Sequence, residues 1–259
     1  MFALPFKRKP APVISSAFSS LLTTTDPHSI IPENSLIGLI AGNGRFPVLF
    51  CESAQRFGYR VFVVGLEGEV DESVRAVADR MEMVKVGEFG RLCSLFTDAG
   101  VRYAAMAGGV KRVNLFGGVK LDARGAMLLV RLRSAKDDVI MRGVAGELAR
   151  DGITVVSSSL FMSDFLIPEG VLTKSRPSKE EEEDVRVGRA ALAAMSSQDI
   201  GQLVVVKEGV VVAVEAVEGS DAAIRRGGAL GGPGTVVVKF PKATQDLRFD
   251  LPTVGCRTI

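Results

Sequence analysis

The chain has 259 residues, a formal net charge of +2, and 47% hydrophobic residues. This length and apolar content support one large domain or two modest ones with real cores, and we expect two. The nearly balanced charge and the absence of Trp offer neither the field nor the stacking surface of a nucleic-acid binder, so we expect no nucleic-acid partner. Three widely separated cysteines favour neither a disulfide framework nor a zinc site, which fits a reducing cytoplasm.

The chain contains a single histidine, His28, which lies outside every periodic segment of the sequence. This excludes Ser-His-Asp and Cys-His catalysis as well as a histidine-based zinc site. An enzyme with this composition must work with carboxylates, Lys, Arg, hydroxyls and backbone amides. A hard cation such as Mg²⁺, which prefers oxygen ligands, is compatible with that set.

Residues 1–35 are rich in Ser, Thr and Pro, with a basic cluster at Lys7, Arg8 and Lys9 and almost no acidic residues. This composition predicts a disordered tail, and a targeting segment is the alternative. No later segment reaches the roughly 18 uninterrupted apolar residues that a membrane-spanning helix needs.

From Leu36 onward, strands and helices alternate around glycine turns, which is typical of a parallel sheet covered by helices. The fold class we predict is α/β, with a Rossmann-like parallel-sheet domain over residues 36–167. The expected strands are 36–40, 60–66, 81–86, 101–107 and 153–156, and the expected helices are 48–57, 89–99, 122–133 and 136–150.

Ligands of such sheets bind beyond the carboxyl ends of the strands, where two glycine turns are expected to face one crevice. The candidate binding residues of these turns are Gly42, Asn43, Gly44, Gly108, Gly109, Lys111 and Arg112. Glycine lets backbone amides approach a phosphate at a helix start, and the two cations can bind an anion. For Lys111 and Arg112 the alternative is a charged loop that keeps the strand soluble.

A GxG turn after a strand also suggests dinucleotide binding, but the third glycine of that motif is replaced here by Pro47. Glu67 would have to serve as the ribose-binding acid without the rest of the motif. An NAD-dependent oxidoreductase therefore stays an alternative.

The sequence 168–170 (Pro-Glu-Gly) interrupts the pattern and predicts a domain boundary, followed by a smaller α+β domain over 168–259. Ser178 and Glu181 form a capping box, so the acidic run behind them is explained by a helix start. The segments 203–207 and 209–215 predict a hairpin, 220–226 a short helix, 227–234 a mobile loop and 235–240 a strand.

Charges of both signs follow that last strand, in a segment between Pro241 and Pro252 that is otherwise apolar enough to be half buried. A site that handles a phosphate and a metal ion needs this combination. The alternative is a sheet edge with ordinary surface charges. The charged residues are Lys239, Lys242, Asp246, Arg248 and Asp250.

Short motifs follow one another from Leu36 to about Gly255. They occupy 40–47 (IAGNGRFP), 63–68, 87–90, 106–112, 122–125, 137–138, 199–202, 215, 218–221 (EGSD), 239–242, 245–248 and 250–253. In number and order they resemble the LpxI-type UDP-2,3-diacylglucosamine pyrophosphatases of lipid A biosynthesis.

This resemblance implies Mg²⁺-dependent hydrolysis of the diphosphate of UDP-2,3-diacylglucosamine, which releases UMP and 2,3-diacylglucosamine 1-phosphate (lipid X). It further implies a homodimer with product held between two domains, a cytoplasmic location and peripheral contact with the inner membrane. It also implies that the second domain is incomplete at Ile259, because relatives continue through a further strand, helix and strand.

Combined with the charge pattern, the resemblance assigns roles to particular residues. We expect Asp221, which aligns with the critical carboxylate of the family's EG(T/S)D motif, to hold the metal or orient water, with Asp246 and Asp250 as possible further ligands. The residues expected to face phosphate are Lys239, Lys242 and Arg248, and Gln202 and Gln245 join the substrate-binding set. A nucleotide-sugar binding module that has lost catalysis stays an alternative, because of the missing terminal elements.

Overall fold

The computed structural model describes residues 26–110, 120–132, 137–196, 198, 200–242, 246, 248–249, 252–255 and 258. The chain divides into two units. The first, called here the Rossmann-like unit, comprises Thr24–Ile167 and Asp246–Leu251. The second, called the C-terminal unit, includes Pro168–Gln245 and Pro252–Ile259.

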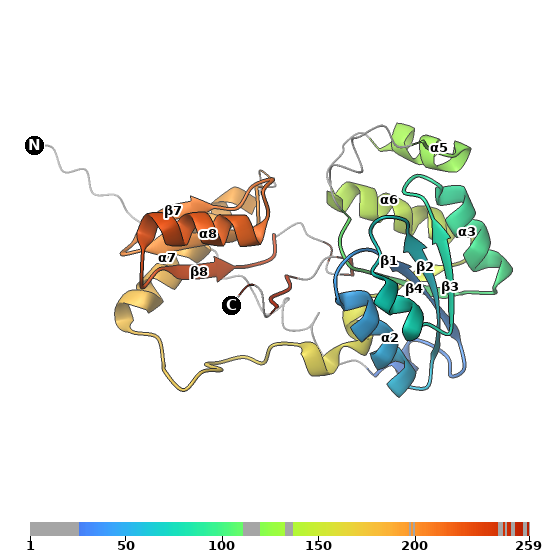
Figure 1. Cartoon of the computed structure of the whole chain (residues 1–259), viewed down its shortest axis with the longest axis horizontal. Helices are drawn as coiled ribbons and strands as arrows, with labels where there is room; N and C mark the ends of the chain where they lie inside the picture. Colours follow the sequence, from blue (N-terminus) through green and yellow to red (C-terminus); the bar gives the residue numbers. More distant parts are fainter. Residues whose placement is uncertain are drawn as a thin grey trace, which may run out of the picture. The chain divides into compact units, whose positions relative to one another are not determined.

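The Rossmann-like unit is built on a parallel sheet of five strands in the order β3-β2-β1-β4-β5 (Figure 1). The strands are β1 Leu36–Ala41, β2 Arg60–Leu66, β3 Arg80–Val84, β4 Tyr103–Ala107 and β5 Thr154–Val155. Five consecutive residues of β2 are buried, as expected for a parallel strand with both faces covered. The predicted Rossmann-like sheet is confirmed.

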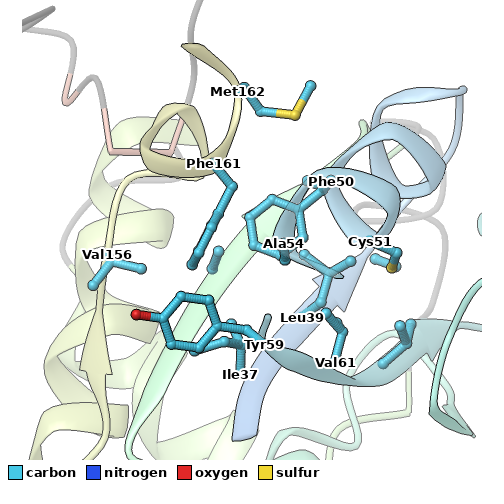
Figure 2. Packing of buried hydrophobic residues seen from close by; sticks show 14 of the residues in the cluster. Ile37, Leu39, Phe50, Cys51, Ala54, Tyr59, Val61, Val156, Phe161 and Met162 are labelled. Carbon is cyan, nitrogen blue, oxygen red and sulfur yellow. The ribbon is translucent and has the colours of Figure 1, made fainter. Parts of the chain in front are cut away.

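Helices and short 3₁₀ turns cover the sheet and give it two cores. The helices are α2 Phe46–Arg56, α3 Phe89–Asp98, α5 Ala123–Arg131 and α6 Asp137–Arg150, and the turns are η1 Pro27–Ser29, η2 Glu72–Ala76, η3 Ser158–Phe161 and η4 Ser163–Phe165. Figure 2 shows the first core, in which Phe50 of α2 and Phe161 of η3 pack over Leu39 of β1. The second core joins Phe62 and Phe96 with Leu148.

Residues 26–35 are part of this unit, whereas their composition predicted a disordered tail up to Ser35. Ile31 is fully buried, and its carbonyl oxygen accepts a hydrogen bond of 2.8 Å from the hydroxyl of Tyr59. The ring of His28 stacks on Tyr59, with 5.2 Å between ring centroids. The chain's single histidine is therefore a packing partner of the first core.

The C-terminal unit has an antiparallel sheet in the order β7-β6-β8 with one helix on each face. The strands are β6 Leu203–Lys207, β7 Val210–Val214 and β8 Val236–Lys239, and the helices are α7 Lys179–Ser196 and α8 Ser220–Gly231. Side chains of β6 alternate between the faces, so that Val204 packs in the core with Leu192 of α7 and Val205 in the core with Ala223 of α8.

Glycines let both helices of this unit approach the sheet closely. A Cβ atom on Gly227 of α8 would lie 2.5 Å from Val205 Cγ2, and one on Gly188 of α7 would lie 2.5 Å from Val238 Cγ2. The segment 227–231, predicted to be a mobile loop, is the second half of α8. The prediction is wrong for 227–231, because these residues are helical and Gly227 packs the helix against Val205 of the sheet.

The acidic start of α7 stabilises the helix and the neighbouring hairpin, as the capping-box pattern predicted. Ser178 N donates to Glu181 Oε2 at 2.7 Å, and Glu181 N donates to Ser178 Oγ at 3.2 Å. One turn later, the buried carboxylate of Asp184 accepts hydrogen bonds from the backbone amides of Glu208 and Gly209. The acids at this helix start are therefore structural.

Two cysteines, Cys51 and Cys93, are buried in the Rossmann-like unit. Burial raises the pKa of each thiol to about 12, so both stay protonated at neutral pH and neither is a nucleophile. Within the part of the chain that the structure describes, no helix has both the length and the apolarity to cross a bilayer.

Two adjacent glycines of α8 give a test of this packing. Gly227 is buried against Val205, whereas a Cβ atom on Gly228 would meet nothing within 4 Å. We expect Gly227→Ala to lower the free energy of unfolding by about 1–3 kcal/mol through overpacking. Gly228→Ala is expected to raise it by about 0.5–1 kcal/mol, since alanine is the better helix former. Urea unfolding followed by circular dichroism measures both, and equal shifts for the two variants would contradict the packing.

Candidate active site

The first set of candidate residues lies at the point where the strand order of the Rossmann-like sheet reverses. Strand β1 lies between β2 and β4, so the loops that follow β1 and β4 leave the sheet side by side at the usual ligand-binding edge. These loops are joined by backbone hydrogen bonds. Asn43 N donates to Gly109 O at 2.8 Å, and Gly109 N donates to Asn43 O at 3.2 Å. The two predicted glycine turns are thus brought together.

The approach of the two loops leaves no room for side chains. A Cβ atom on Gly42 would lie 2.2 Å from Gly109 O, and one on Gly108 would lie 2.5 Å from Asn43 O. Gly108 also has a φ of 86°, which favours glycine. These two glycines are therefore required for the loops to pair.

The backbone amides of Gly42 and Asn43, which were predicted to bind a phosphate, instead make hydrogen bonds within the protein. Gly42 N donates to Ala107 O at 2.9 Å, and Asn43 N is bonded to Gly109. Gly44 is exposed with open space around it, directly before the start of α2, whose N-cap residue Arg45 makes no side-chain cap. Gly44 and Arg45 are therefore the exposed part of the turn. Any contact of this turn with a phosphate is restricted to these two residues.

The side chain of Asn43 is held by an acid that the sequence interpretation missed. Its Nδ2 donates to Glu69 Oε2 at 2.9 Å, and Glu69 is only 5% exposed. The sequence directed attention to Glu67, which is exposed. The buried acid is Glu69, two residues further on, and the hydrophobic periodicity did not predict its burial. Lys111 and Arg112 lie outside the described residues.

A second set of candidate residues lies at one end of the C-terminal sheet, where β7 and β8 end and β6 begins. Gln202, directly before β6, accepts a 2.9 Å hydrogen bond from Phe240 N after β8. On the other side of β6, Glu215 N after β7 donates to Leu203 O at 2.9 Å. Lys239 is the last residue of β8, so this end of the sheet brings the predicted site residues Gln202 and Lys239 together with Glu215.

Glu215 organises this end of the sheet. It is 7% exposed and accepts hydrogen bonds of 3.1 Å from both Gln202 N and Ser220 Oγ. It therefore ties the first residue of α8 to the start of β6. The side-chain oxygen of Gln202 is buried without a hydrogen-bond partner. Glu215 occurs in the family motifs, but the sequence alone gave it no role.

The two acids of the EGSD motif differ in their surroundings. Glu218 binds Arg226 at 2.7 Å, and it also accepts a hydrogen bond from Ala216 N. Asp221 is exposed in the first turn of α8 and makes no hydrogen bond or ion pair with the described residues. The N-cap of α8 is Gly219, which provides no side-chain cap, so the first amides of the helix are open to an anion.

The charged segment after β8 does not form the single wall that its sequence suggested. Lys239 and Lys242 belong to the C-terminal unit, with Lys239 Nζ donating to Thr253 O at 2.8 Å. Asp246 and Arg248 belong to the Rossmann-like unit. The segment therefore contributes to both units. Gln245 and Asp250 lie outside the described residues.

Asp246 and Arg248 form an ion pair with two contacts. Arg248 Nε lies 3.0 Å from Asp246 Oδ1, and Nη2 lies 2.7 Å from Oδ2. The hydrogen bonds from Arg248 hold the pKa of Asp246 below its usual value. The guanidinium also lies 4.7 Å from the ring centre of Phe249, which packs against the second core of its unit. The pair is internal to this segment, and the contact of the segment with the core of the Rossmann-like unit is made by Phe249.

These contacts bear on the expected Mg²⁺ ligands. No group of three or more His, Cys, Asp or Glu residues capable of holding a metal occurs among the residues described. Asp246 does not fit as a ligand, because both of its oxygens are bound by Arg248. Mg²⁺ can also bind with few protein ligands, keeping several waters and contacting one carboxylate and the phosphates of the substrate. Asp221 fits a site of this type.

Family models match both parts of the chain. The LpxI N-terminal domain model matches residues 36–165, and the LpxI C-terminal domain model matches residues 168–259. The chain belongs to the LpxI family. It is 34% identical over 236 residues to UDP-2,3-diacylglucosamine pyrophosphatase LpxI of Caulobacter vibrioides, covering 86% of this chain and 82% of that protein.

Solved structures resemble the chain more distantly. N5-carboxyaminoimidazole synthetase from Staphylococcus aureus complexed with ADP matches with a TM-score of 0.31 and 13% identity, over 81% of this chain and 48% of that one. The biotin carboxylase domain of Hydrogenobacter thermophilus 2-oxoglutarate carboxylase matches with a TM-score of 0.30 and 13% identity, over 79% and 44% of the two chains. The chain spans less than half the length of each.

The contact between Asn43 and Glu69 yields a prediction that depends on pH. We expect Asn43→Ala to lower the free energy of unfolding by about 1–3 kcal/mol, because the buried Glu69 carboxylate loses the hydrogen bond from Asn43 Nδ2. Asn43→Asp should cost more at pH 7, since it places a second carboxylate beside Glu69. This repulsion raises the folded-state pKa of the pair, so the added loss should fade as the pH falls below about 5.

Denaturant unfolding at pH 7 and at pH 4.5 measures the difference between these two variants. Asn34→Asp, at an exposed position of the same unit, is the control for a new surface carboxylate. A gap between Asn43→Asp and Asn43→Ala that does not change with pH would contradict the expected repulsion.

Proposed function

We propose that the protein hydrolyses the diphosphate bond of UDP-2,3-diacylglucosamine in lipid A biosynthesis. The products are UMP and 2,3-diacylglucosamine 1-phosphate, lipid X. The observation that carries this proposal is the 34% identity to the Caulobacter vibrioides protein named for that activity, over 86% of the chain. The match of the LpxI domain models to both halves of the chain supports it.

In this proposal the start of α8 receives the diphosphate. The amides of the first helical turn carry partial positive charge, and no side chain caps them. Asp221 in the same turn orients the attacking water and accepts its proton. Glu215 positions this turn through its hydrogen bond with Ser220.

Cationic side chains neutralise the charge that builds up on the phosphate oxygens during hydrolysis. We assign this role to Lys239 and Lys242, which belong to the same unit as Asp221. Contact of Arg248 with a phosphate stays a prediction, because its guanidinium already pairs with Asp246. No covalent nucleophile is needed.

The proposal includes dependence on Mg²⁺, with Asp221 as its protein ligand. When bound, the cation would neutralise the diphosphate and polarise the bond that is cleaved. It further includes binding of substrate by Gly44 and Gln202, action as a homodimer in the cytoplasm, and peripheral contact with the inner membrane. The support for membrane contact is the chemistry of the substrate, whose two acyl chains belong in a bilayer.

Replacement of Asp221 tests the proposed chemistry. We expect Asp221→Asn to lower kcat for UMP release by about a hundredfold or more, because asparagine cannot accept the proton from water. UMP is measured by chromatography after incubation with UDP-2,3-diacylglucosamine dispersed in detergent with Mg²⁺. Asp164→Asn is the matched control, since this exposed carboxylate pairs with Arg56 on the Rossmann-like unit.

The same assay separates the rival functions. UMP release by the unchanged protein that stops with EDTA supports a metal-dependent hydrolase. Substrate binding without UMP would instead indicate a binding module, and binding of NAD alone would indicate an oxidoreductase. Normal turnover by a folded Asp221→Asn variant would remove Asp221 from the chemistry.

A further inference from the structure

The outward face of α5 is apolar. Ala123, Met127 and Val130 follow the helical spacing i, i+4, i+7, and the side chains of Met127 and Val130 are 54% and 85% exposed. The opposite side of the helix carries Leu128, which is 6% exposed and packs in the second core. A surface helix normally turns polar residues outward, so this helix presents apolar side chains to both sides.

The charges around α5 are arranged with acids inside and bases outside. Glu147 of α6 is buried, and Arg131 approaches it at 2.6 Å and Arg124 at 3.6 Å, with Arg150 as a third partner. The side chains of Arg131 and Arg150 remain 50% and 59% exposed. The positive ends of these pairs therefore reach the surface, while the carboxylate that balances them does not.

The segment that leads into α5 continues this arrangement. Helix α5 contains no acidic residue, and its N-cap Asp122 uses its carboxylate to accept amide hydrogens from Gly90 at 2.6 Å and Gly125 at 2.7 Å. Lys120, just before it, is exposed. Figure 1 shows α5 on the outside of α3 and α6, away from the sheet. An apolar stripe bordered by cations thus lies on the outside of the Rossmann-like unit.

We propose that this stripe, with Lys120 and Arg131 at its border, docks on the surface of an anionic lipid bilayer. The inference rests on the proposed function, because a substrate with two acyl chains must be taken from a bilayer. An anionic bilayer offers both partners that the face requires, an apolar layer for Met127 and Val130 and negative headgroups for the bases. A second copy of the chain would offer apolar side chains but would bring like charges together.

Vesicle flotation tests the proposal with the full-length protein. We expect binding to vesicles rich in phosphatidylglycerol, weaker binding at high salt, and little binding to vesicles of phosphatidylcholine alone. The double variant Met127→Gln/Val130→Gln is expected to bind about tenfold more weakly, because the apolar contact is lost. Lys120→Glu should weaken binding without changing the apolar stripe. The matched control is Val210→Gln/Leu230→Gln, two side chains of the C-terminal unit that are 61% and 67% exposed.

Activity assays separate this inference from the proposed function. With substrate dispersed in detergent, the α5 variants should keep the rate of the unchanged protein, whereas with substrate embedded in anionic vesicles they should be about tenfold slower. If the unchanged protein releases no UMP in detergent, the proposed function fails, and flotation still decides whether the face binds lipid.

Several results would overturn the docking proposal. Equal flotation of the α5 double variant and the unchanged protein would do so, and so would absence of binding of the unchanged protein to anionic vesicles. A change from dimer to monomer in light scattering, caused by the α5 double variant, would show that the face is a subunit interface. Thermal melting checks that each variant is folded.

Discussion

The Rossmann-like unit depends on the close pairing of the loops that follow β1 and β4. Two glycines make this possible, since a Cβ atom on Gly42 or on Gly108 would overlap the backbone of the facing loop. The pairing fixes the position of Asn43, whose side chain then meets the buried Glu69. It also determines which part of the turn can meet a ligand. Amides used between loops cannot bind phosphate, which leaves Gly44 and the start of α2 as the free surface.

Patterns within the sequence were sufficient for most of the fold. Apolar runs separated by glycine turns identified the five parallel strands, and the strand β2 was predicted with its observed bounds. Two segments were wrongly predicted to lack fixed structure, because their composition is typical of flexible chain. Residues 26–35 look like a tail, but Ile31 is covered by the core and held by Tyr59. The run of glycines from Gly227 looks flexible, but contact with Val205 requires a small residue in that helix.

The candidate site was predictable only in part, because sequence spacing does not show which charges are paired. Lys239, Asp246 and Arg248 are close in sequence, yet they are divided between the two units. Arg248 occupies both oxygens of Asp246, so the carboxylate predicted to bind a metal is already engaged by a neighbouring cation. Glu69 and Glu215 were missed because their roles arise from burial and from hydrogen-bond donors on other elements of the fold. The apolar stripe of α5 has helical spacing, but only the structure shows that it faces outward.

The acids of the described chain separate into two groups with different physical demands. A buried carboxylate needs hydrogen bonds to offset the loss of water, and Asp184, Glu147 and Glu215 each have them. Such groups are committed to the fold and cannot change partners during a reaction without a large cost. Asp221 is exposed, and the described residues give it neither a hydrogen bond nor an ion pair. It lies at an uncapped helix start that Glu215 holds in place. Among the described acids at this end of the C-terminal sheet, Asp221 is therefore the one free to bind a ligand.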